Sequence, residues 1–257
     1  MNDPRASAAA YYDFATQKTD DIPFYIAHLP GADSSVLELG CGTGRVTIPL
    51  SKHCRFVHGL DNSESMIRRC EAKLVAAQIP ASRVTVQLAD VTEHSLGRRF
   101  DRVIAPFRML QNLATDSAVD GFFQRIAAHL EDDGVAVVST FNPNRTRDEL
   151  VARWALPAEE LLWEAPDGTD TIRCFVRRAR FTTDPLVLYP DTIYRRVRAG
   201  RVVDEVVLSV PMRCYYPEEL VQLVERHGFG IVDTWGGYAG EAYGTGKELV
   251  VAMRHGV

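Results

Sequence analysis

A glycine-rich turn between a predicted strand and a predicted helix constrains this chain more than any other segment. Residues 38–44 have the sequence ELGCGTG and follow the short apolar run that begins at Val36. Three glycines within five positions allow the backbone to turn sharply and to approach a ligand closely. A strand, a turn of this kind and a helix form the usual nucleotide-binding corner of a doubly wound sheet.

A carboxylate is expected at the same corner. Asp61 ends the next predicted strand, roughly twenty positions after Gly40, where a carboxylate can accept hydrogen bonds from both hydroxyls of a ribose. The dinucleotide fingerprint G-x-G-x-x-G is disfavoured because Arg45 stands where its last glycine belongs. The phosphate-binding loop G-x-x-x-x-G-K-[ST] is absent from the sequence.

Strands and helices alternate around this corner. Short apolar runs predict strands, and apolar stripes at helical spacing predict helices. The predicted strands are 36–39, 55–60, 84–88, 100–105 and 135–141, and the predicted helices include 43–50, 63–77 and 118–130. A turn is expected at 132–134, where the sequence is Asp-Asp-Gly. This alternation implies right-handed β-α-β units.

The pattern changes after Phe141. Residues 145–165 are expected to be helical in part, and strand-like runs follow at 171–181, 188–198 and 202–212, with a hairpin turn at 199–201. From Pro217 a helix and two strands, 230–235 and 248–253, resume the earlier pattern. We predict an α/β fold, a doubly wound, seven-stranded, mostly parallel sheet with a small antiparallel β cap inserted after strand five. The predicted core comprises residues 1–142 and 215–257, with a helical lid at 1–30, and the predicted cap comprises 143–214.

Composition narrows the class of protein. The 257 residues are 46% hydrophobic and 25% charged, as in an ordinary soluble domain, and the formal net charge of −5 disfavours a dedicated nucleic-acid binder. Five cysteines without a C-x-x-C pair and scattered histidines indicate no metal site. The N-terminus lacks the basic start of a signal peptide, and apolar runs are too short to span a membrane, so we expect a cytoplasmic protein.

The sequence resembles the class I S-adenosylmethionine-dependent methyltransferases. The segment VLELGCGTGRV at 36–46 is similar to the family's first motif, and its later motifs match GLDNSESMI at 59–67, Ala-Asp-Val at 89–91, F-D-x-V at 100–103 and the fifth strand at 134–141. The segments 105–113 and 10–13 resemble a subgroup that acts on small molecules, including amine and amino-sugar N-methyltransferases. The resemblance covers most of the chain and implies the Rossmann-like methyltransferase fold.

The resemblance also implies a cofactor site. The cofactor would be S-adenosylmethionine, the product S-adenosylhomocysteine, and no metal would take part. The residues that this places around the cofactor are Tyr12, Glu38, Gly40, Cys41, Gly42, Gly44, Arg45, Asp61, Asn62, Met66, Asp90, Val91, Pro106 and Phe107. Among them, Asp61 would bind the ribose, Asp90 the adenine amino group, and Glu38 would help to hold the methionine amino group. Two alternatives stay open, namely core packing for Met66 and turn capping for Asp90.

Methyl transfer from a sulfonium is an in-line displacement that requires alignment and exclusion of water. Many members of the subgroup carry His at the position of Asn112, and Asn cannot accept a proton, so we expect Asn112, Gln111 and Phe107 to position the acceptor. The candidate acceptor-binding residues are Tyr11, Arg108, Arg173, Tyr194, Arg195 and Tyr215. Of the two N-terminal tyrosines, Tyr12 rather than Tyr11 is expected to close over the cofactor.

Arginine is concentrated in the predicted cap. Residues 171–213 contain nine Arg against four acidic residues. The concentration indicates either an anionic acceptor held by guanidinium groups or exposed strand edges kept soluble by charge, and we favour the second interpretation.

We predict a soluble enzyme that methylates a small molecule, at nitrogen rather than oxygen. The alternatives are a methyltransferase acting on RNA or protein, a non-catalytic module that binds S-adenosylmethionine, and, more remotely, an NAD oxidoreductase. The expected partner is the small-molecule acceptor, without nucleic acid or membrane, and a homo-oligomer stays open.

Overall fold

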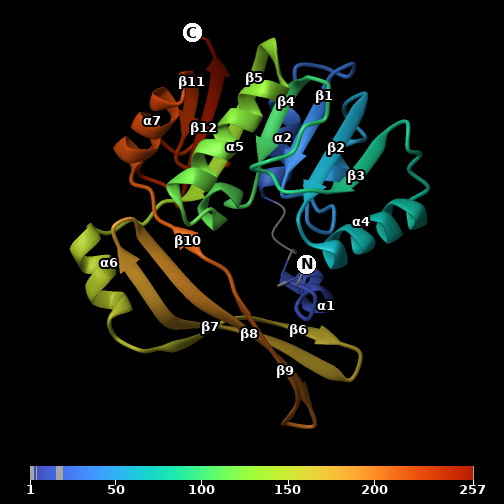
Figure 1. Ribbon diagram of the computed structural model, residues 1–257. Helices are drawn as coiled ribbons and strands as arrows, with labels where there is room; N and C mark the ends of the chain where they lie inside the picture. Colours follow the sequence, from blue (N-terminus) through green and yellow to red (C-terminus); the bar gives the residue numbers. More distant parts are fainter. Residues whose placement is uncertain (1–2, 4, 16–19, 257) are drawn as a thin grey trace.

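The computed structural model describes residue 3, residues 5–15 and residues 20–256, and these form two sheets with flanking helices (Figure 1). The larger sheet has seven strands in the order β11-β12-β5-β4-β1-β2-β3. All neighbouring strands are parallel except β12, which runs antiparallel to both β11 and β5. The strands are β1 Ser35–Leu39, β2 Phe56–Asp61, β3 Val84–Leu88, β4 Phe100–Ala105, β5 Leu130–Phe141, β11 Phe229–Trp235 and β12 Glu248–His255. The predicted doubly wound sheet is confirmed.

Helices cover both faces of this sheet. Along β5, Ala136 and Val138 belong to the core under one face, whereas Val135 and Val137 belong to the core under the other. A strand buried on both faces is a near-continuous apolar run, which is why the sequence predicted these strands well. The helices are α2 Asp21–Ala27, α3 Thr47–Leu50, α4 Glu64–Ala76, α5 Asp116–His129 and α7 Pro217–Arg226.

Local boundaries differ from the prediction in two places. Helix α3 is shorter than the predicted 43–50, because residues 42–46 are still part of the turn. Strand β5 begins at Leu130, so the turn predicted at 132–134 was wrong. Between Leu130 and Val135 the register with β4 shifts, and this irregularity absorbs the exposed Asp-Asp-Gly sequence within the strand.

The second sheet is antiparallel and lies between β5 and α7 in the chain. Its strands are β6 Glu159–Asp167, β7 Asp170–Thr183, β8 Leu186–Arg198, β9 Arg201–Ser209 and β10 Met212–Arg213. Helix α6, Arg147–Trp154, precedes it, and β8 pairs with β7 on one side and with β9 and β10 on the other. The hairpin predicted at 199–201 is confirmed, since Ala199 and Gly200 both have positive φ as a two-residue turn requires. The domain boundaries at 143 and 214 remain a prediction.

Strand β6 replaces part of the helix expected over 145–165. Residues 159–167 pair along one side with β7 only, and most of them are exposed. A solvent-exposed edge strand lacks the clear apolar alternation from which a strand is predicted.

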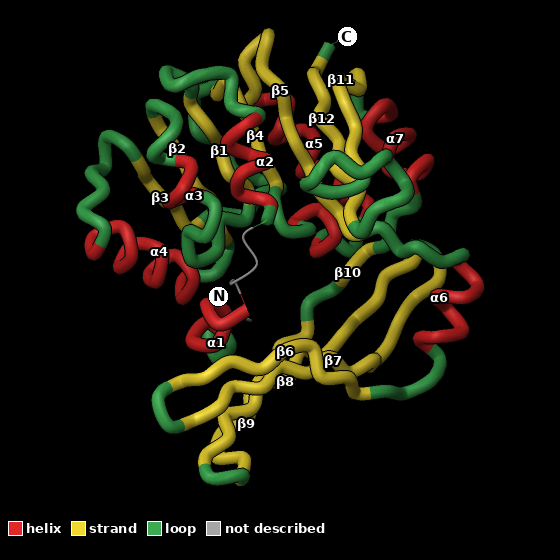
Figure 2. Tube along the Cα trace, turned by 180° about the vertical axis from the view of Figure 1, so that it is seen from behind, coloured by secondary structure: helices red, strands yellow, loops and turns green. Residues whose placement is uncertain are grey.

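Helix α1, Ala9–Ala15, lies between the two sheets. Figures 1 and 2 place it beneath the carboxyl ends of the parallel strands and above the second sheet. Tyr11 of this helix and Ala8, just before it, pack in a core with residues of β7, β8 and β9, namely Ile172, Cys174, Tyr194 and Leu208. Helix α1 therefore lies between the glycine-rich turn of the first sheet and the second sheet.

Candidate cofactor and acceptor site

The glycine-rich turn is tightly folded against β2. The backbone amides of Gly40 and Cys41 both donate to the Leu60 carbonyl at 2.8 Å. Gly40 has φ of 77°, and a Cβ atom there would lie 2.6 Å from the Met109 side chain. Only glycine fits this position, since the backbone is left-handed and has no room for a side chain.

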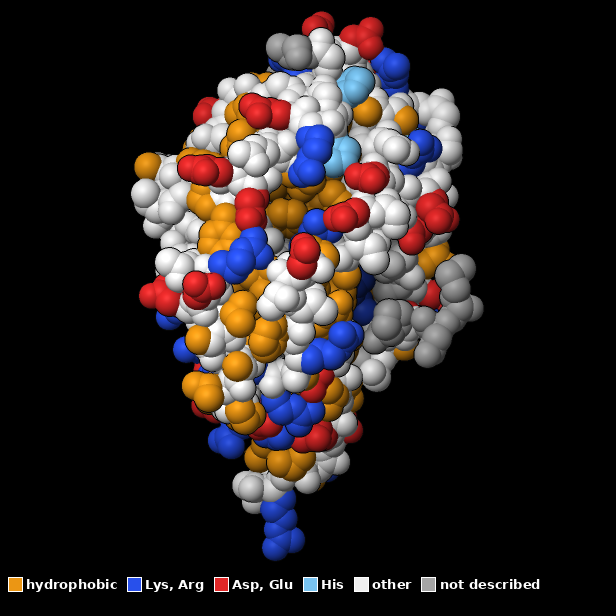
Figure 3. Space-filling model, turned by 60° about the vertical axis from the view of Figure 1, so that its left-hand side comes forward, with side chains coloured by type: hydrophobic (Ala, Val, Ile, Leu, Met, Phe, Trp, Pro, Cys, Tyr) orange, Lys and Arg blue, Asp and Glu red, His pale blue; other side chains and the backbone are white. Residues whose placement is uncertain are grey.

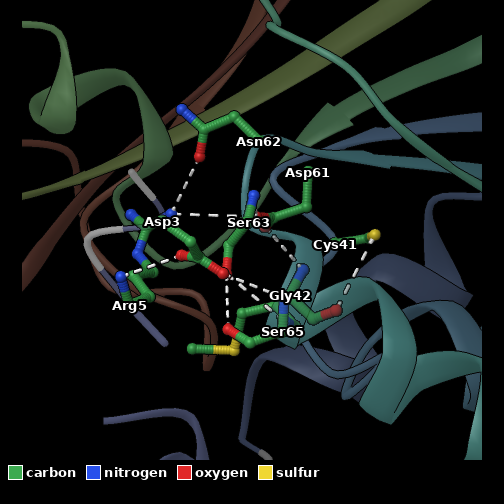
Figure 4. Close-up of polar contacts among 9 residues, drawn as sticks. Asp3, Arg5, Cys41, Gly42, Asp61, Asn62, Ser63 and Ser65 are labelled. Atoms are coloured by element: carbon green, nitrogen blue, oxygen red, sulfur yellow. Dashed lines mark hydrogen bonds and ion pairs between the residues drawn. The ribbon is translucent and has the colours of Figure 1, made fainter. Parts of the chain in front are cut away.

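Asp61 is held at the mouth of this turn. Its Oδ2 accepts a hydrogen bond from the Gly42 amide and its Oδ1 one from the Ser63 amide, both at 2.9 Å (Figure 4). The residue is 4% exposed. Each carboxylate oxygen has two lone pairs, so each keeps one for a further donor. Two adjacent hydroxyls of a ribose supply two donors, which is the role predicted for Asp61.

Glu38 lies beneath the turn, 1% exposed, where it accepts a 2.5 Å hydrogen bond from the Thr47 hydroxyl. Burial raises the pKa of Glu38 to about 8, and the Thr47 hydrogen bond opposes that rise. A buried carboxyl of this kind gains its charge most easily when a cation approaches. The predicted contact with a cofactor ammonium therefore has a physical basis.

Arg45 has an ion-pair partner that the sequence does not predict. Its guanidinium forms two hydrogen bonds with the Asp21 carboxylate, at 2.5 and 2.7 Å, and both side chains are buried. The guanidinium also lies over the Phe107 ring, 5.0 Å from its centroid. Arg45 thus joins α2, the glycine-rich turn and the loop after β4. Asp21 and Arg45 are 24 positions apart in the sequence, so no local pattern predicts their contact.

Three further residues predicted around the cofactor follow β2 and β3 in the chain. Met66 is fully buried on α4, and Val91 belongs to the main core. Asp90 is exposed, and its Oδ1 accepts hydrogen bonds from the amide and hydroxyl of Thr92 at 2.8 and 2.7 Å. Asp90 therefore does cap a turn, as the alternative proposed, and its role toward adenine stays a prediction.

The loop after β4 has an unusual backbone. Phe107 and Arg108 are consecutive non-glycine residues in the left-handed region, with φ of 52° and 66°, and they follow the buried Pro106. Phe107 is 47% exposed. Arg108 donates to both carboxylate oxygens of Glu248, from Nε at 3.2 Å and from Nη2 at 2.6 Å. Such backbone conformations cost free energy and are concentrated at functional sites.

Gln111 and Asn112 differ in their surroundings. Gln111 is fully buried in the 3-10 helix η1, Met109–Asn112, and its side chain donates to the Arg213 carbonyl at 2.8 Å and accepts from the Phe141 amide at 2.7 Å. Both ends of its amide are thus engaged by backbone groups, so Gln111 fastens η1 to β5 and β10. Asn112 is half-buried at the end of η1.

The two N-terminal tyrosines face different sheets. Tyr11 stacks on Tyr194, with ring centroids 5.5 Å apart, and its hydroxyl donates to Asp204. Tyr12 faces the glycine-rich turn, where its ring edge would lie 3.8 Å from a Cβ atom placed on Gly42. This geometry supports the expectation that Tyr12 rather than Tyr11 meets the cofactor.

The cap arginines mostly have acidic partners. Arg173 pairs with Glu164 at 3.2 Å, and Arg195 pairs with Glu205 and Glu159 at 2.6 Å each. The sequence count over 171–213 left out the acidic residues of β6, which supply two of these partners, Glu159 and Glu164. Basic and acidic side chains are correspondingly interspersed on the face seen in Figure 3. Charge pairing on exposed strands, rather than a ready anion site, accounts for the arginine concentration.

The remaining acceptor candidates are buried. Tyr194 is packed under α1, and Tyr215 lies in the main core, where its hydroxyl has no hydrogen-bond partner among the described residues. Burial raises the pKa of Tyr215 above its ordinary range.

The described residues contain neither a metal-binding cluster nor a helix able to cross a membrane. No group of three or more His, Cys, Asp or Glu side chains there is arranged to hold a metal ion. Among those residues, no helix has the length and apolar character needed to cross a membrane.

Residues 36–134 match the family model described as a methyltransferase domain. This stretch contains the glycine-rich turn, Asp61, Asp90 and the loop after β4. Over this stretch the chain is similar to a methyltransferase domain, and its resemblance to the class I S-adenosylmethionine-dependent methyltransferases is confirmed.

Among curated proteins, the chain is 32% identical over 126 residues to a dTDP-3-amino-3,6-dideoxy-alpha-D-glucopyranose N,N-dimethyltransferase of Streptomyces fradiae, covering 49% of this chain and 46% of that protein. The CcbJ methyltransferase of Streptomyces caelestis shares the fold, with a TM-score of 0.74 at 22% identity over 93% of this chain and 90% of that one. The amino pentose methyltransferase CalS10 of Micromonospora echinaspora, solved with S-adenosylmethionine bound, gives a TM-score of 0.65 at 21% identity over 93% and 90% of the two chains. The chain spans about half the length of the curated amino-sugar relatives it matches.

Proposed function

We propose that this protein transfers a methyl group from S-adenosylmethionine to a small-molecule acceptor by direct in-line displacement, at nitrogen rather than oxygen. The observation that carries the proposal is the Asp61 carboxylate, which the Gly42 and Ser63 amides orient at the edge of the glycine-rich turn. The match of residues 36–134 to a methyltransferase domain supports the same cofactor.

Methyl transfer requires little of the protein other than alignment of the acceptor with the methyl group. The sulfonium loses its methyl group to a lone pair of the acceptor and leaves as a neutral thioether, so no covalent enzyme intermediate forms. The rigid turn and Asp61 would fix the nucleoside, and Glu38 would face the ammonium of the methionine part. The strained loop at Phe107 and Arg108 would border the methyl group and restrict the direction of attack.

The size of the acceptor follows from the second sheet. The second sheet and α1 lie below the carboxyl ends of the parallel strands, so an acceptor that reaches the methyl group from this side would be a small molecule. The mixed surface charge and the net charge of −5 disfavour a nucleic-acid acceptor. Nitrogen is preferred because relatives named as amino-sugar N,N-dimethyltransferases match the chain.

The experiment has a binding arm and a transfer arm. Calorimetry of the purified protein with S-adenosylmethionine, S-adenosylhomocysteine and NAD should show binding of the first two only. Tritium from labelled S-adenosylmethionine should then appear in a dTDP-3-amino-3,6-dideoxyglucose probe rather than in its 3-hydroxyl counterpart, a comparison needed because the curated relatives also include oxygen methyltransferases. Label in RNA or protein instead would favour the macromolecular alternative, and no binding of either sulfur nucleoside would overturn the proposal.

A further inference from the structure

Two charged residues of the N-terminal segment lie on the corner predicted to hold the ribose. The Arg5 guanidinium is 3.7 Å from Asp61 Oδ1 and donates to Asn62 Oδ1 at 3.3 Å. The Asp3 carboxylate accepts hydrogen bonds from the Ser63 hydroxyl at 3.0 Å and the Ser65 amide at 2.9 Å (Figure 4). Asp3 therefore lies at the beginning of α4, whereas Arg5 faces the carboxylate of Asp61, two residues before the helix cap Ser63.

Arg5 lies beside one of the two carboxylate oxygens that a ribose would need, Oδ1 of Asp61. Backbone amides take one lone pair on each oxygen of Asp61, and the side chain is only 5% exposed beneath Arg5. A ribose hydroxyl that approaches Oδ1 would meet this guanidinium. A buried carboxylate without a neighbouring positive charge is costly even when amides donate to it, so Arg5 stabilises Asp61 while the ribose is absent.

The rest of the segment is fastened at independent points. Asp13 accepts a hydrogen bond from the Thr43 hydroxyl at 2.7 Å and pairs with Lys73 at 2.6 Å, and Tyr11 is bound to the second sheet. The Arg5 carbonyl accepts from the amides of Ala8 and Ala9, so its backbone belongs with α1. Helix α1 can thus stay in place while the side chains of Arg5 and Asp3 leave their partners. The charged contacts at Asp3 and Arg5 form a separate unit, which we call the N-terminal latch.

We propose that the N-terminal latch is an autoinhibitory contact in which Arg5 occupies the Asp61 carboxylate and is exchanged for the ribose of the cofactor. The inference rests on the proposed cofactor site and adds its regulation. Latch opening and cofactor binding are coupled, because both compete for the same carboxylate. Asp3 and Arg5 therefore weaken cofactor binding, although both lie outside the stretch that matches a methyltransferase domain.

The coupling predicts that loss of the latch tightens binding. In calorimetry with S-adenosylhomocysteine, Arg5→Ala should lower Kd about fivefold, the effect expected of a partly exposed ion pair. Arg5→Lys, which keeps the charge, should stay near wild type. Asp3→Asn, which weakens the anchor at Ser63 and Ser65, should change Kd in the same direction as Arg5→Ala. Arg68→Ala is the matched control, because Arg68 pairs with Glu64 on the exposed side of α4.

Salt supplies a second readout. Raising NaCl from about 50 to about 500 mM screens the Arg5–Asp61 pair, so it should tighten binding to wild type more than binding to Arg5→Ala. Unchanged or weaker binding by Arg5→Ala would overturn the latch. That outcome differs from failure of the proposed function, in which neither wild type nor any variant would bind S-adenosylhomocysteine.

Discussion

Arg45 and Asp21 form a buried ion pair with two hydrogen bonds, at 2.5 and 2.7 Å, which joins the start of α2 to the glycine-rich turn. The same guanidinium lies over Phe107 beside the proposed methyl position. The Arg45 side chain therefore connects the glycine-rich turn, the loop after β4 and the helix that precedes β1.

Breaking this pair on one side should be costly. Asp21→Ala leaves the Arg45 charge buried without its carboxylate, and we expect a loss of about 3–5 kcal/mol in the free energy of unfolding. Urea titration measures the loss. The double variant Asp21→Leu with Arg45→Met removes both charges and should be distinctly more stable than Asp21→Ala. Equal stability of the two variants would show that the buried charge is not the cause.

Gly40 tests the fit of the turn itself. Gly40→Ala combines a left-handed backbone with a Cβ atom 2.6 Å from Met109, whereas Gly97→Ala has φ of 62° but no atom within 4 Å of the new Cβ. We expect about 1 kcal/mol of destabilisation for Gly97→Ala and roughly 2–4 kcal/mol for Gly40→Ala. Thermal or urea unfolding of both variants gives the comparison. Similar losses at the two positions would contradict a steric role for Gly40.

Substitution of Gln111 should lower mainly the stability of the protein, whereas substitution of Asn112 should lower mainly the rate of methyl transfer. Gln111→Leu leaves the Phe141 amide and the Arg213 carbonyl without a partner in the interior, which should cost about 2–5 kcal/mol of stability. Asn112→Ala should change stability by less than about 1 kcal/mol and lower kcat of methyl transfer, if Asn112 orients the acceptor. Urea unfolding and transfer kinetics, measured on both variants, check this; a stability loss confined to Asn112→Ala would reverse the assignment.

The pKa of Glu38 predicts a pH dependence of stability. Because the folded-state value of about 8 lies above the ordinary value of 4.5, the unfolded chain releases this proton first as pH rises. Glu38 should therefore lower the free energy of unfolding progressively between about pH 4.5 and pH 8, with no further loss above that range. Glu38→Gln, which keeps the shape and the acceptor for Thr47, should remove this slope. Parallel pH profiles for wild type and variant would contradict the assignment.

How well the sequence predicted the structure depended on the range of the interactions. Strands β3 and β4 match their predicted limits because their apolar runs are local signals. The helix predicted from residue 63 begins there for a local reason too, since the Ser63 hydroxyl caps α4 by accepting from the Met66 amide three residues on.

What the sequence did not predict depends on contacts between distant residues. Arg5 meets Asp61, Asp21 meets Arg45, and Arg108 meets Glu248 only after the chain has folded. Residue type alone does not tell which of the many charged pairs will meet. The edge strand β6 was missed for a related reason: its acidic side chains pair with arginines of β7 and β8 instead of forming an apolar pattern.

The central claim is that Asp61 holds the ribose of S-adenosylmethionine, and calorimetric titration with S-adenosylhomocysteine tests it most directly. Asp61→Ala removes two hydrogen bonds to a charged group, each worth about 1.5–3 kcal/mol, so its Kd should rise by roughly a hundredfold or more over wild type. Asp132→Ala, at an exposed position remote from this corner, should bind like wild type. If Asp61→Ala is folded and binds with the wild-type Kd, the proposed cofactor site is wrong.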